Sequence, residues 1–259
     1  MKEKAYLFGP FIGSAFWEFF RFAPYTIYLK KKNPDVKIII LTRPSRFDFY
    51  GKYSDILIPL KIEDNKSTQD CFKSSDISIS NYNKLKESFN KSYKERFEII
   101  DHFCPDISHF RYKVKWQFPR QYMNYDFNPR QKNIDIINNI DSTASVLIDL
   151  SWLNDNDLKK TLLNELNEDN INYLDYEEFL KYIPEDLNDN EYSHYGCLIS
   201  LIKNMSLVIG NIKESIPTKL SLLLKTSVIT INESLSLDSI SLINPMNTSV
   251  KFYEKEEVK

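Results

Sequence analysis

Short hydrophobic runs alternate with longer amphipathic stretches near the start of the chain. Residues 4–9 form an apolar run that ends in Gly-Pro, residues 36–41 are β-branched, and residues 55–60 end near a proline. Between the first two runs lies an aromatic stretch that contains Pro24 and finishes with consecutive lysines, which suits the negative end of a helix dipole. Strand, helix, strand, loop and strand in this order predict a parallel sheet with right-handed crossovers.

Residues 61–100 are predicted to be polar at first and then helical, with apolar side chains recurring on one face of the helix. Leu85, Phe89, Tyr93 and Phe97 follow one another at a spacing of four residues. That spacing is typical of the buried stripe of an amphipathic helix. We therefore expect this stripe to face the core.

A second block of alternating elements follows the polar stretch 138–143. It begins with the buried strand 145–150. The elements predicted after it are a helix near 157–167, a helix over 195–204, a strand over 206–210, a helix over 216–224 and a strand over 227–231. The chain is thus expected to form two α/β, Rossmann-like domains with parallel sheets. We expect the boundary near residue 140, with domains at 1–140 and 141–259.

Composition restricts the classes of function. The 259 residues are 42% hydrophobic, which is typical of a folded chain, and the formal net charge of −2 provides no global basic field for nucleic acid or membrane. No run is long enough to span a bilayer and the N-terminus is not a signal peptide, so we expect a cytoplasmic protein without a transmembrane segment. The charge is uneven: residues 111–132 are basic and aromatic, and residues 154–191 are acidic.

Metal and glycine-rich nucleotide motifs are missing from the sequence. The three cysteines are far apart, His102, His109 and His194 have no metal-ligand spacing, and the acidic pair around Asn156 lies at the polar start of a helix. The few glycines form neither a dinucleotide fingerprint nor a P-loop. We expect no metal and no cofactor.

Two loops at predicted strand ends are the candidate ligand sites, because open α/β sheets bind ligands beyond the carboxyl ends of their strands. The first is 9–14 and the second is 210–219. In the second, Ser215 is a candidate N-cap, Pro217 fits the first helical turn, and Thr218 and Lys219 can contact a diphosphate. An ordinary capped helix explains the same pattern.

The segment 195–231 resembles the donor-binding segment of ADP-heptose:lipopolysaccharide heptosyltransferases and related GT-B glycosyltransferases. It carries a helix, a strand that ends in Gly-Asn, and then Glu-Ser-Ile-Pro-Thr-Lys before the next strand. The family has Asp-Ser/Thr-Gly-Pro-x-His in this position. The resemblance places the following residues in a donor site: Gly210, Asn211, Glu214, Ser215, Thr218 and Lys219.

Residues 5–60 are similar to the acceptor domain of the same family. The family has an aspartate, the expected catalytic base, directly after its loop glycine; here Ser14 follows Gly13, and the nearest acid downstream is Glu18. The resemblance implies a GT-B-like fold with two domains facing a cleft. It also implies inverting, metal-independent transfer from a nucleotide-diphosphate sugar to an acceptor, with Gly13 and Ser14 on the acceptor side.

Acidic and basic residues of the first domain complete the candidate site. Glu18 sits in an aromatic cluster, and apolar surroundings raise a carboxyl pKa toward the range of a general base; a surface acid or a partner of Arg21 is the alternative. Arg43, Arg46 and Asp48 follow a strand end, where two arginines suit an anionic acceptor and Asp48 is a second candidate base. A structural pair between Arg46 and Asp48 explains them too.

Three functions remain open on the sequence. The leading one is a glycosyltransferase acting on a saccharide, with Lys115, Trp116 and Arg120 as further acceptor contacts. The second is a phage-type DNA-base glycosyltransferase, in which the basic and aromatic stretch follows the phosphate backbone. The third is a catalytically inactive, glycosyltransferase-like binding module.

Overall fold

The computed structural model describes residues 2–12, 18–60, 79–104, 126–140, 143–154, 156–183, 194–212, 214–232 and 250–254. The chain forms two compact units. The first consists of Met1–Arg130 and Asp186–Gly196, and the second of Gln131–Glu185 and Cys197–Lys259. The helix α4 (Gln131–Asn138), which precedes the boundary expected near residue 140, belongs to the second unit.

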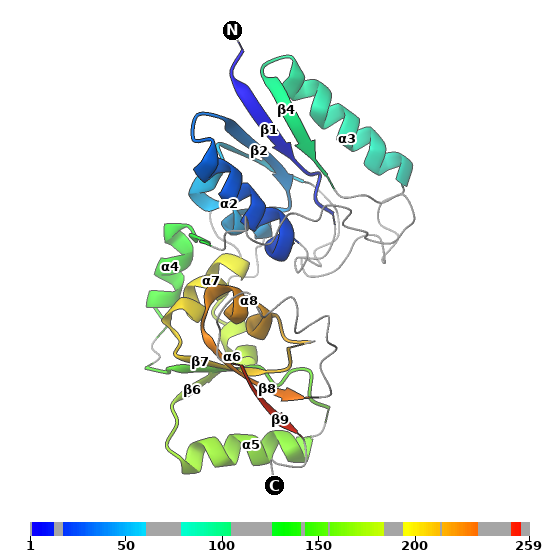
Figure 1. Ribbon diagram of the computed structural model, residues 1–259. Helices are drawn as coiled ribbons and strands as arrows, with labels where there is room; N and C mark the ends of the chain where they lie inside the picture. Colours follow the sequence, from blue (N-terminus) through cyan, green and yellow to red (C-terminus); the bar gives the residue numbers. More distant parts are fainter. Residues whose placement is uncertain are drawn as a thin grey trace. The chain divides into compact units, whose positions relative to one another are not determined.

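The first unit is built on a four-stranded parallel sheet (Figure 1). Its strands are β1 (Lys4–Phe8), β2 (Lys37–Thr42), β3 (Ile56–Pro59) and β4 (Glu98–Phe103), in the spatial order β3-β2-β1-β4. The connections include η1 (Glu18–Phe22), a π-helical turn that continues into α2 (Ala23–Lys32), then the short 3₁₀ helices η2 (Pro44–Phe49) and η3 (Gly51–Tyr53), and α3 (Ile79–Lys94).

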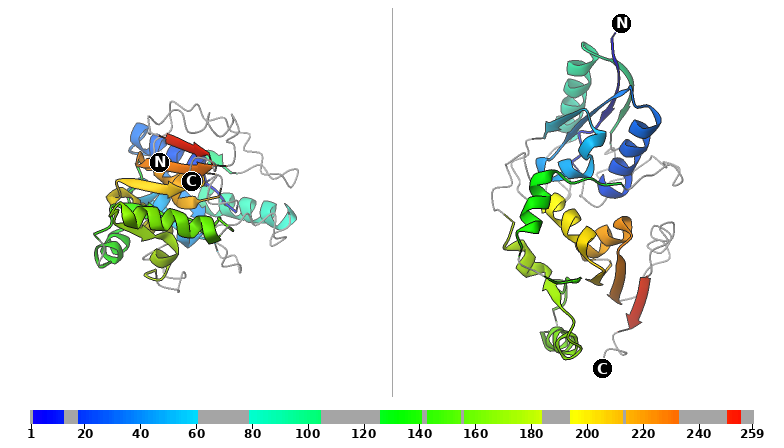
Figure 2. Two further views of the ribbon diagram at one scale, coloured as in Figure 1. Left: turned by 90° about the horizontal axis from the view of Figure 1, so that it is seen from below. Right: turned by 90° about the vertical axis from the view of Figure 1, so that its left-hand side faces the viewer.

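Helices α2 and α3 lie on opposite sides of this sheet (Figures 1 and 2). On the α3 side, Tyr82 and Phe89 join the core cluster of Leu7 and Ile39. On the other side, the ring centroids of Phe8 and Phe22 are 6.2 Å apart. Successive strand residues therefore face different helices, as the two-residue period of a strand requires.

The amphipathic stripe predicted from residue 85 faces the core. Phe89 and Phe97 are buried, and Leu85 and Tyr93 pack against them. The helix itself ends at Lys94, so Phe97 joins the cluster from the turn that leads into β4.

The second unit contains a five-stranded parallel sheet in the spatial order β6-β5-β7-β8-β9. Its strands are β5 (Val146–Ile148), β6 (Tyr173–Asp175), β7 (Leu207–Gly210), β8 (Ser227–Asn232) and β9 (Val250–Glu254). The helices that follow α4 are α5 (Asn156–Glu168), α6 (Tyr176–Leu180), α7 (His194–Asn204) and α8 (Ile216–Leu224). The expectation of an α/β fold with parallel sheets is confirmed.

Helices α5 and α8 cover opposite faces of this second sheet (Figure 1). Ile209 and Ile231 belong to a cluster against which Leu162 of α5 packs. Val228, from the other face of β8, packs with Leu222 of α8. The central strand β8 is thus packed on both sides, which is why it appears in the sequence as a nearly continuous apolar run.

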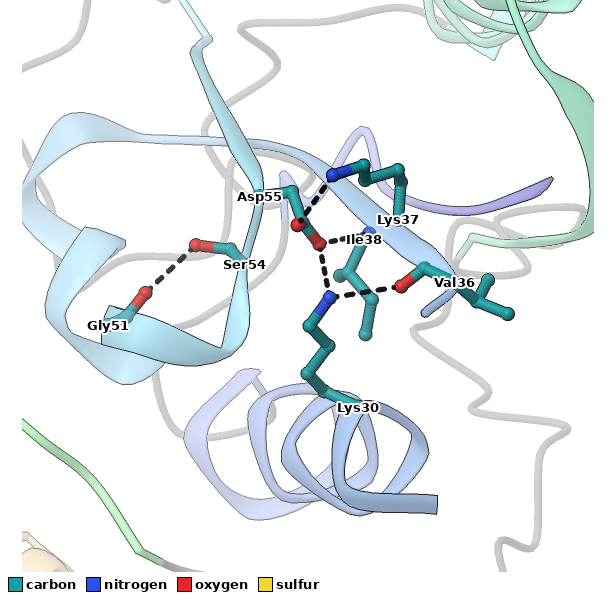
Figure 3. Close-up of polar contacts among 7 residues, drawn as sticks. All are labelled: Lys30, Val36, Lys37, Ile38, Gly51, Ser54 and Asp55. Atoms are coloured by element: carbon teal, nitrogen blue, oxygen red, sulfur yellow. Dashed lines mark hydrogen bonds and ion pairs between the residues drawn. The ribbon is translucent and has the colours of Figure 1, made fainter. Parts of the chain in front are cut away.

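Asp55 joins three elements of the first unit at the start of the strands (Figure 3). Its Oδ2 accepts hydrogen bonds from Lys30 Nζ, at the end of α2, and from the Ile38 N–H, each at 2.8 Å. Lys37 Nζ lies 3.6 Å from Oδ1. Burial alone raises the pKa of Asp55, but the hydrogen bonds and the two lysine charges outweigh it and lower the pKa below its ordinary value.

Within the residues that the structure describes, none of the helices combines the length and the hydrophobicity needed to cross a membrane.

Candidate functional site

Both sheets contain a point where the chain changes direction. In the first unit, β1 connects outward to β2 and β3 on one side, and β4 then pairs with its other edge. In the second, β5 is followed by β6 on one side and by β7 on the other. Ligands of doubly wound sheets bind at such switch points, beyond the carboxyl ends of the strands. The candidate sites are therefore beside Gly9 and beside Gly210.

Helix α8 begins at the second switch point with the cap that the sequence predicts. Ser215 is the N-cap: its Oγ accepts hydrogen bonds from the Thr218 N–H at 3.2 Å and from Thr218 Oγ1 at 2.8 Å. Pro217 has no backbone N–H, and the backbone N–H of Thr218 already donates to the Ser215 cap. Few first-turn N–H groups are therefore left to bind an anion.

Gly210 ends β7 where the chain has no room for a side chain. A Cβ at this position would lie 2.6 Å from Thr218 Oγ1, and 3.1 Å from both Ser215 Oγ and the Asp149 carbonyl oxygen. The end of β5, the end of β7 and the start of α8 thus converge within contact distance. This brings together three of the donor-site residues expected from the sequence.

The loop between β7 and α8 is held by its own backbone. The Asn211 carbonyl accepts hydrogen bonds from the N–H groups of Glu214 at 3.2 Å and Ser215 at 2.7 Å, while Asn211 Oδ1 lies 3.3 Å from the Glu214 nitrogen. The Ile212 N–H donates to Thr230 Oγ1. Asn211 therefore shapes the loop, and Glu214 is exposed.

Lys219 supplies the cation of this site. Burial lowers the pKa of its ammonium, and the negative charges of Glu214 and Asp149 act in the opposite direction. Asp149 directly follows β5 and is only 2% exposed. The apolar run 145–150 predicts Asp149 only as part of a strand, although its position after apolar residues is the signal that identifies the loops 9–14 and 210–219.

Glu18 is fully buried, in surroundings that differ from those expected. The sequence predicts an apolar environment, yet three polar groups donate to its carboxylate: Arg46 at 2.8 Å to Oε2, and Thr42 and Tyr50 at 2.5 Å to Oε1. Both oxygens are therefore engaged. Glu18 joins the start of η1 to the end of β2 and to η2, and its role as a general base stays a prediction.

Asp48 is buried and binds Arg130 through both carboxylate oxygens. Arg130 Nε and its NH2 group donate to the carboxylate at 2.8–3.3 Å, and the Arg130 backbone N–H donates to Oδ1 at 2.8 Å. Arg130 Cζ also lies 6.0 Å from the centre of the Phe47 ring. The sequence considers Arg46 and Asp48 as partners; in the structure Arg46 pairs with Glu18 and Asp48 with Arg130.

Two of the predicted acceptor residues can be placed. Arg46 is fully buried in its pair with Glu18, and Arg43 is 5% exposed. The others, Gly13, Ser14, Lys115, Trp116 and Arg120, lie outside the described residues.

His102 fixes the first switch point. Its Nε2 lies 2.7 Å from the Gly9 carbonyl oxygen, and its Nδ1 lies 3.2 Å from Asn90 Nδ2. A neutral ring that donates from Nε2 and accepts at Nδ1 satisfies both contacts. Burial lowers the pKa of His102, which favours this neutral form.

Among the described side chains, no group of three or more His, Cys, Asp or Glu residues is placed to hold a metal ion.

Comparison with known proteins identifies relatives through structure. No family model matches the sequence, and no curated protein does either. The glycosyl transferase family 9 protein from Veillonella parvula aligns over 97% of this chain and 87% of its own, with a TM-score of 0.55 and 9% identity. E. coli heptosyltransferase WaaC, solved with ADP, aligns over 99% and 94%, with a TM-score of 0.52 and 10% identity. The same enzyme with ADP-2-deoxy-2-fluoro heptose gives a TM-score of 0.51.

These matches establish the fold. The chain shares the architecture of family 9 glycosyltransferases and heptosyltransferases over nearly its whole length, which confirms at the level of fold the resemblance seen in the sequence.

Proposed function

We propose that this protein is a glycosyltransferase that moves a sugar from a nucleotide-diphosphate sugar to a saccharide hydroxyl, with inversion and without a metal ion. The observation that carries the proposal is the convergence of Gly210, the capped start of α8 and the ammonium of Lys219 at the switch point of the second sheet. It is supported by a fold shared with glycosyltransferases, one of which was solved with ADP and with an ADP-sugar.

The donor's diphosphate would bind against Lys219. When the bond between the sugar and the diphosphate breaks, negative charge develops on the leaving phosphate oxygen. A partly buried ammonium stabilises that charge more strongly than an exposed one, because water screens it less. The absence of a side chain at Gly210 lets the start of α8 lie against the end of β7, which brings Lys219 to the switch point.

The acceptor would bind on the first unit, beside Gly9 and the η2 segment. Glu18 and Asp48 each hold an arginine there, so the acceptor side starts from a fixed arrangement of charges. The catalytic base must lie within reach of the acceptor hydroxyl. Glu18 stays the proposed base: Oε2 accepts one hydrogen bond, from Arg46, and keeps one lone pair for a proton.

The experiment is a donor screen followed by a comparison of variants. Thermal shift with ADP-, UDP- and GDP-sugars identifies the donor, since a ligand that binds the folded state raises the melting temperature. Calorimetry then compares the wild type with Lys219→Ala, which should bind the corresponding nucleoside diphosphate about tenfold more weakly, the effect of one charge-assisted contact.

The matched control is Lys225→Ala, which removes an exposed ammonium from the C-terminal end of the same helix. Its affinity should equal that of the wild type. If both variants lose the same affinity for the nucleoside diphosphate, or if neither loses any, Lys219 is not part of the site. Donor binding without any sugar transfer or donor hydrolysis would favour the inactive binding module.

A further inference from the structure

We propose that Asp149 accepts a hydrogen bond from a sugar hydroxyl of the donor, either on the ribose or on the transferred sugar. Asp149 would then select donors that carry hydroxyl groups beside the diphosphate. This inference rests on the proposed function, because it assigns a further residue to the same proposed donor site.

The backbone holds Asp149 at the switch point. Its N–H donates to the Ile209 carbonyl at 2.9 Å, and its own carbonyl accepts the Trp152 indole N–H at 2.8 Å. That carbonyl also lies 3.1 Å from the position of a Cβ on Gly210. Asp149 is therefore anchored where β5, β7 and α8 meet.

Only one of the two carboxylate oxygens of Asp149 accepts hydrogen bonds within the described part of the chain. Oδ1 accepts hydrogen bonds from Ser151 Oγ at 2.6 Å and from the Ser151 N–H at 3.2 Å. Oδ2 accepts none from any residue in the described part of the chain. An ionised carboxylate can accept about four hydrogen bonds, and buried polar atoms are normally satisfied. A carboxylate that is 98% buried with one unused oxygen thus has capacity for a ligand's donor.

The chemistry of a nucleotide-diphosphate sugar decides which part of it meets Asp149. Ionised phosphate oxygens only accept hydrogen bonds, so a carboxylate repels them. Ribose and sugar hydroxyls donate, and they are the groups that a carboxylate binds. Lys219 has the opposite preference. The switch point therefore offers a cation for the diphosphate and an acceptor for a hydroxyl, and this arrangement would orient the donor.

The test compares ligands with and without hydroxyl groups. Wild type, Asp149→Asn and the control Asp169→Asn, which removes an exposed charge after α5, are titrated by calorimetry with inorganic diphosphate, ADP, UDP and their glucose conjugates. Asp149→Asn should bind the hydroxyl-bearing ligand about tenfold more weakly. It should bind inorganic diphosphate equally well or better, because a repelling charge is lost. Asp169→Asn should match the wild type.

The ligand that loses affinity identifies the hydroxyl. A loss already present for the nucleoside diphosphate indicates the ribose, and a loss confined to the glucose conjugate indicates the transferred sugar. If the variant does not fold, the same comparison is made on the wild type with 2′-deoxy- and 3′-deoxynucleotides and with nucleotide conjugates of deoxyglucose. At least one of these deoxy compounds must then bind about tenfold more weakly than its hydroxyl-bearing counterpart.

Equal or stronger binding of every ligand by Asp149→Asn, or wild-type affinity for every deoxy compound, overturns the inference while diphosphate binding at Lys219 stands. If the wild type binds neither diphosphate nor nucleotide, the proposed function itself fails.

Discussion

At the scale of single residues, the pair of Glu18 and Arg46 has the largest expected effect on stability. Both side chains are completely buried, and each neutralises the other. Glu18→Gln removes the buried carboxylate charge that the Arg46 guanidinium contacts at 2.8 Å, so we expect the free energy of unfolding to fall by about 3–5 kcal/mol. Urea denaturation at neutral pH measures this loss.

The double variant Glu18→Gln/Arg46→Met separates an ion pair from a catalytic role. Removal of both charges should recover much of the lost stability, because the buried guanidinium is removed together with the carboxylate that it contacts. Turnover of the stable double variant should stay at least about 10²-fold below wild type if Glu18 is the base, and wild-type turnover would exclude Glu18 from that role. A single variant as stable as the wild type would contradict the anchoring role.

His194 should make stability depend on pH. Burial lowers the pKa of this first residue of α7 to about 4. The unfolded chain takes up a proton below a pH of about 6.5, and the folded chain does so only near pH 4, so stability falls as the pH decreases between these values. The loss at pH 4 is about 3 kcal/mol.

Urea denaturation of wild type and His194→Gln at several pH values between 7.5 and 4 measures this contribution. The variant should lose less stability on acidification. Burial also lowers the pKa of His102, so the stability of the variant still declines somewhat as the pH falls. Identical pH profiles would show that His194 titrates normally in the folded state.

At the scale of elements, the contact between β7 and α8 depends on Gly210. Gly210→Ala places a methyl group 2.6 Å from Thr218 Oγ1, so strand and helix must move apart. We expect a loss of about 1–3 kcal/mol in stability and a weaker donor site. Thr218→Ala in the same chain removes the clashing oxygen, and the double variant should be more stable than Gly210→Ala plus the separate cost of Thr218→Ala. Strict additivity in thermal or urea denaturation would contradict the clash.

The elements that the sequence predicts are those with a strong apolar period. Strands β1, β2, β5, β7 and β8 are buried on both faces and were all expected. Strand β4 was missed because it lies at the sheet edge and mixes Glu98, Asp101 and His102 with isoleucines, one of which, Ile100, is 45% exposed. Periodicity indicates burial, and a half-exposed edge strand provides little of it.

The site was predictable to the extent that it depends on local sequence. Ser215 as an N-cap follows from a polar residue before an apolar helix with proline in its first turn. The partners of Glu18, and the pair of Asp48 with Arg130, join residues 24–82 positions apart along the chain. Only the sheet order brings them together, and a single sequence does not contain that information.

At the scale of the whole molecule, the chain enters the first unit twice. Asp186–Gly196 belongs to the unit formed by Met1–Arg130, and the buried ring of Tyr195 lies 5.1 Å from that of Phe49. Tyr195→Ala should therefore destabilise the first unit by about 3 kcal/mol.

Hydrogen exchange measures this effect in each unit separately. Exchange should increase in peptides that cover β1 and β2 more than in those that cover β5 and β6. Tyr182→Ala, which truncates a ring that is 52% exposed, should change neither. Equal acceleration in all four strands would indicate that the two units unfold together.

The same return of the chain has a consequence for synthesis on the ribosome. The residues of β1–β4 all precede Arg130, yet Tyr195 is translated only after much of the next unit. At about 5–20 residues per second, the nascent chain waits roughly 3–13 s between these points. During that interval the surface that Tyr195 covers around Phe49 is exposed. Trigger-type chaperones that bind apolar segments of emerging chains should therefore stay on the first unit until residue 195 has left the exit tunnel.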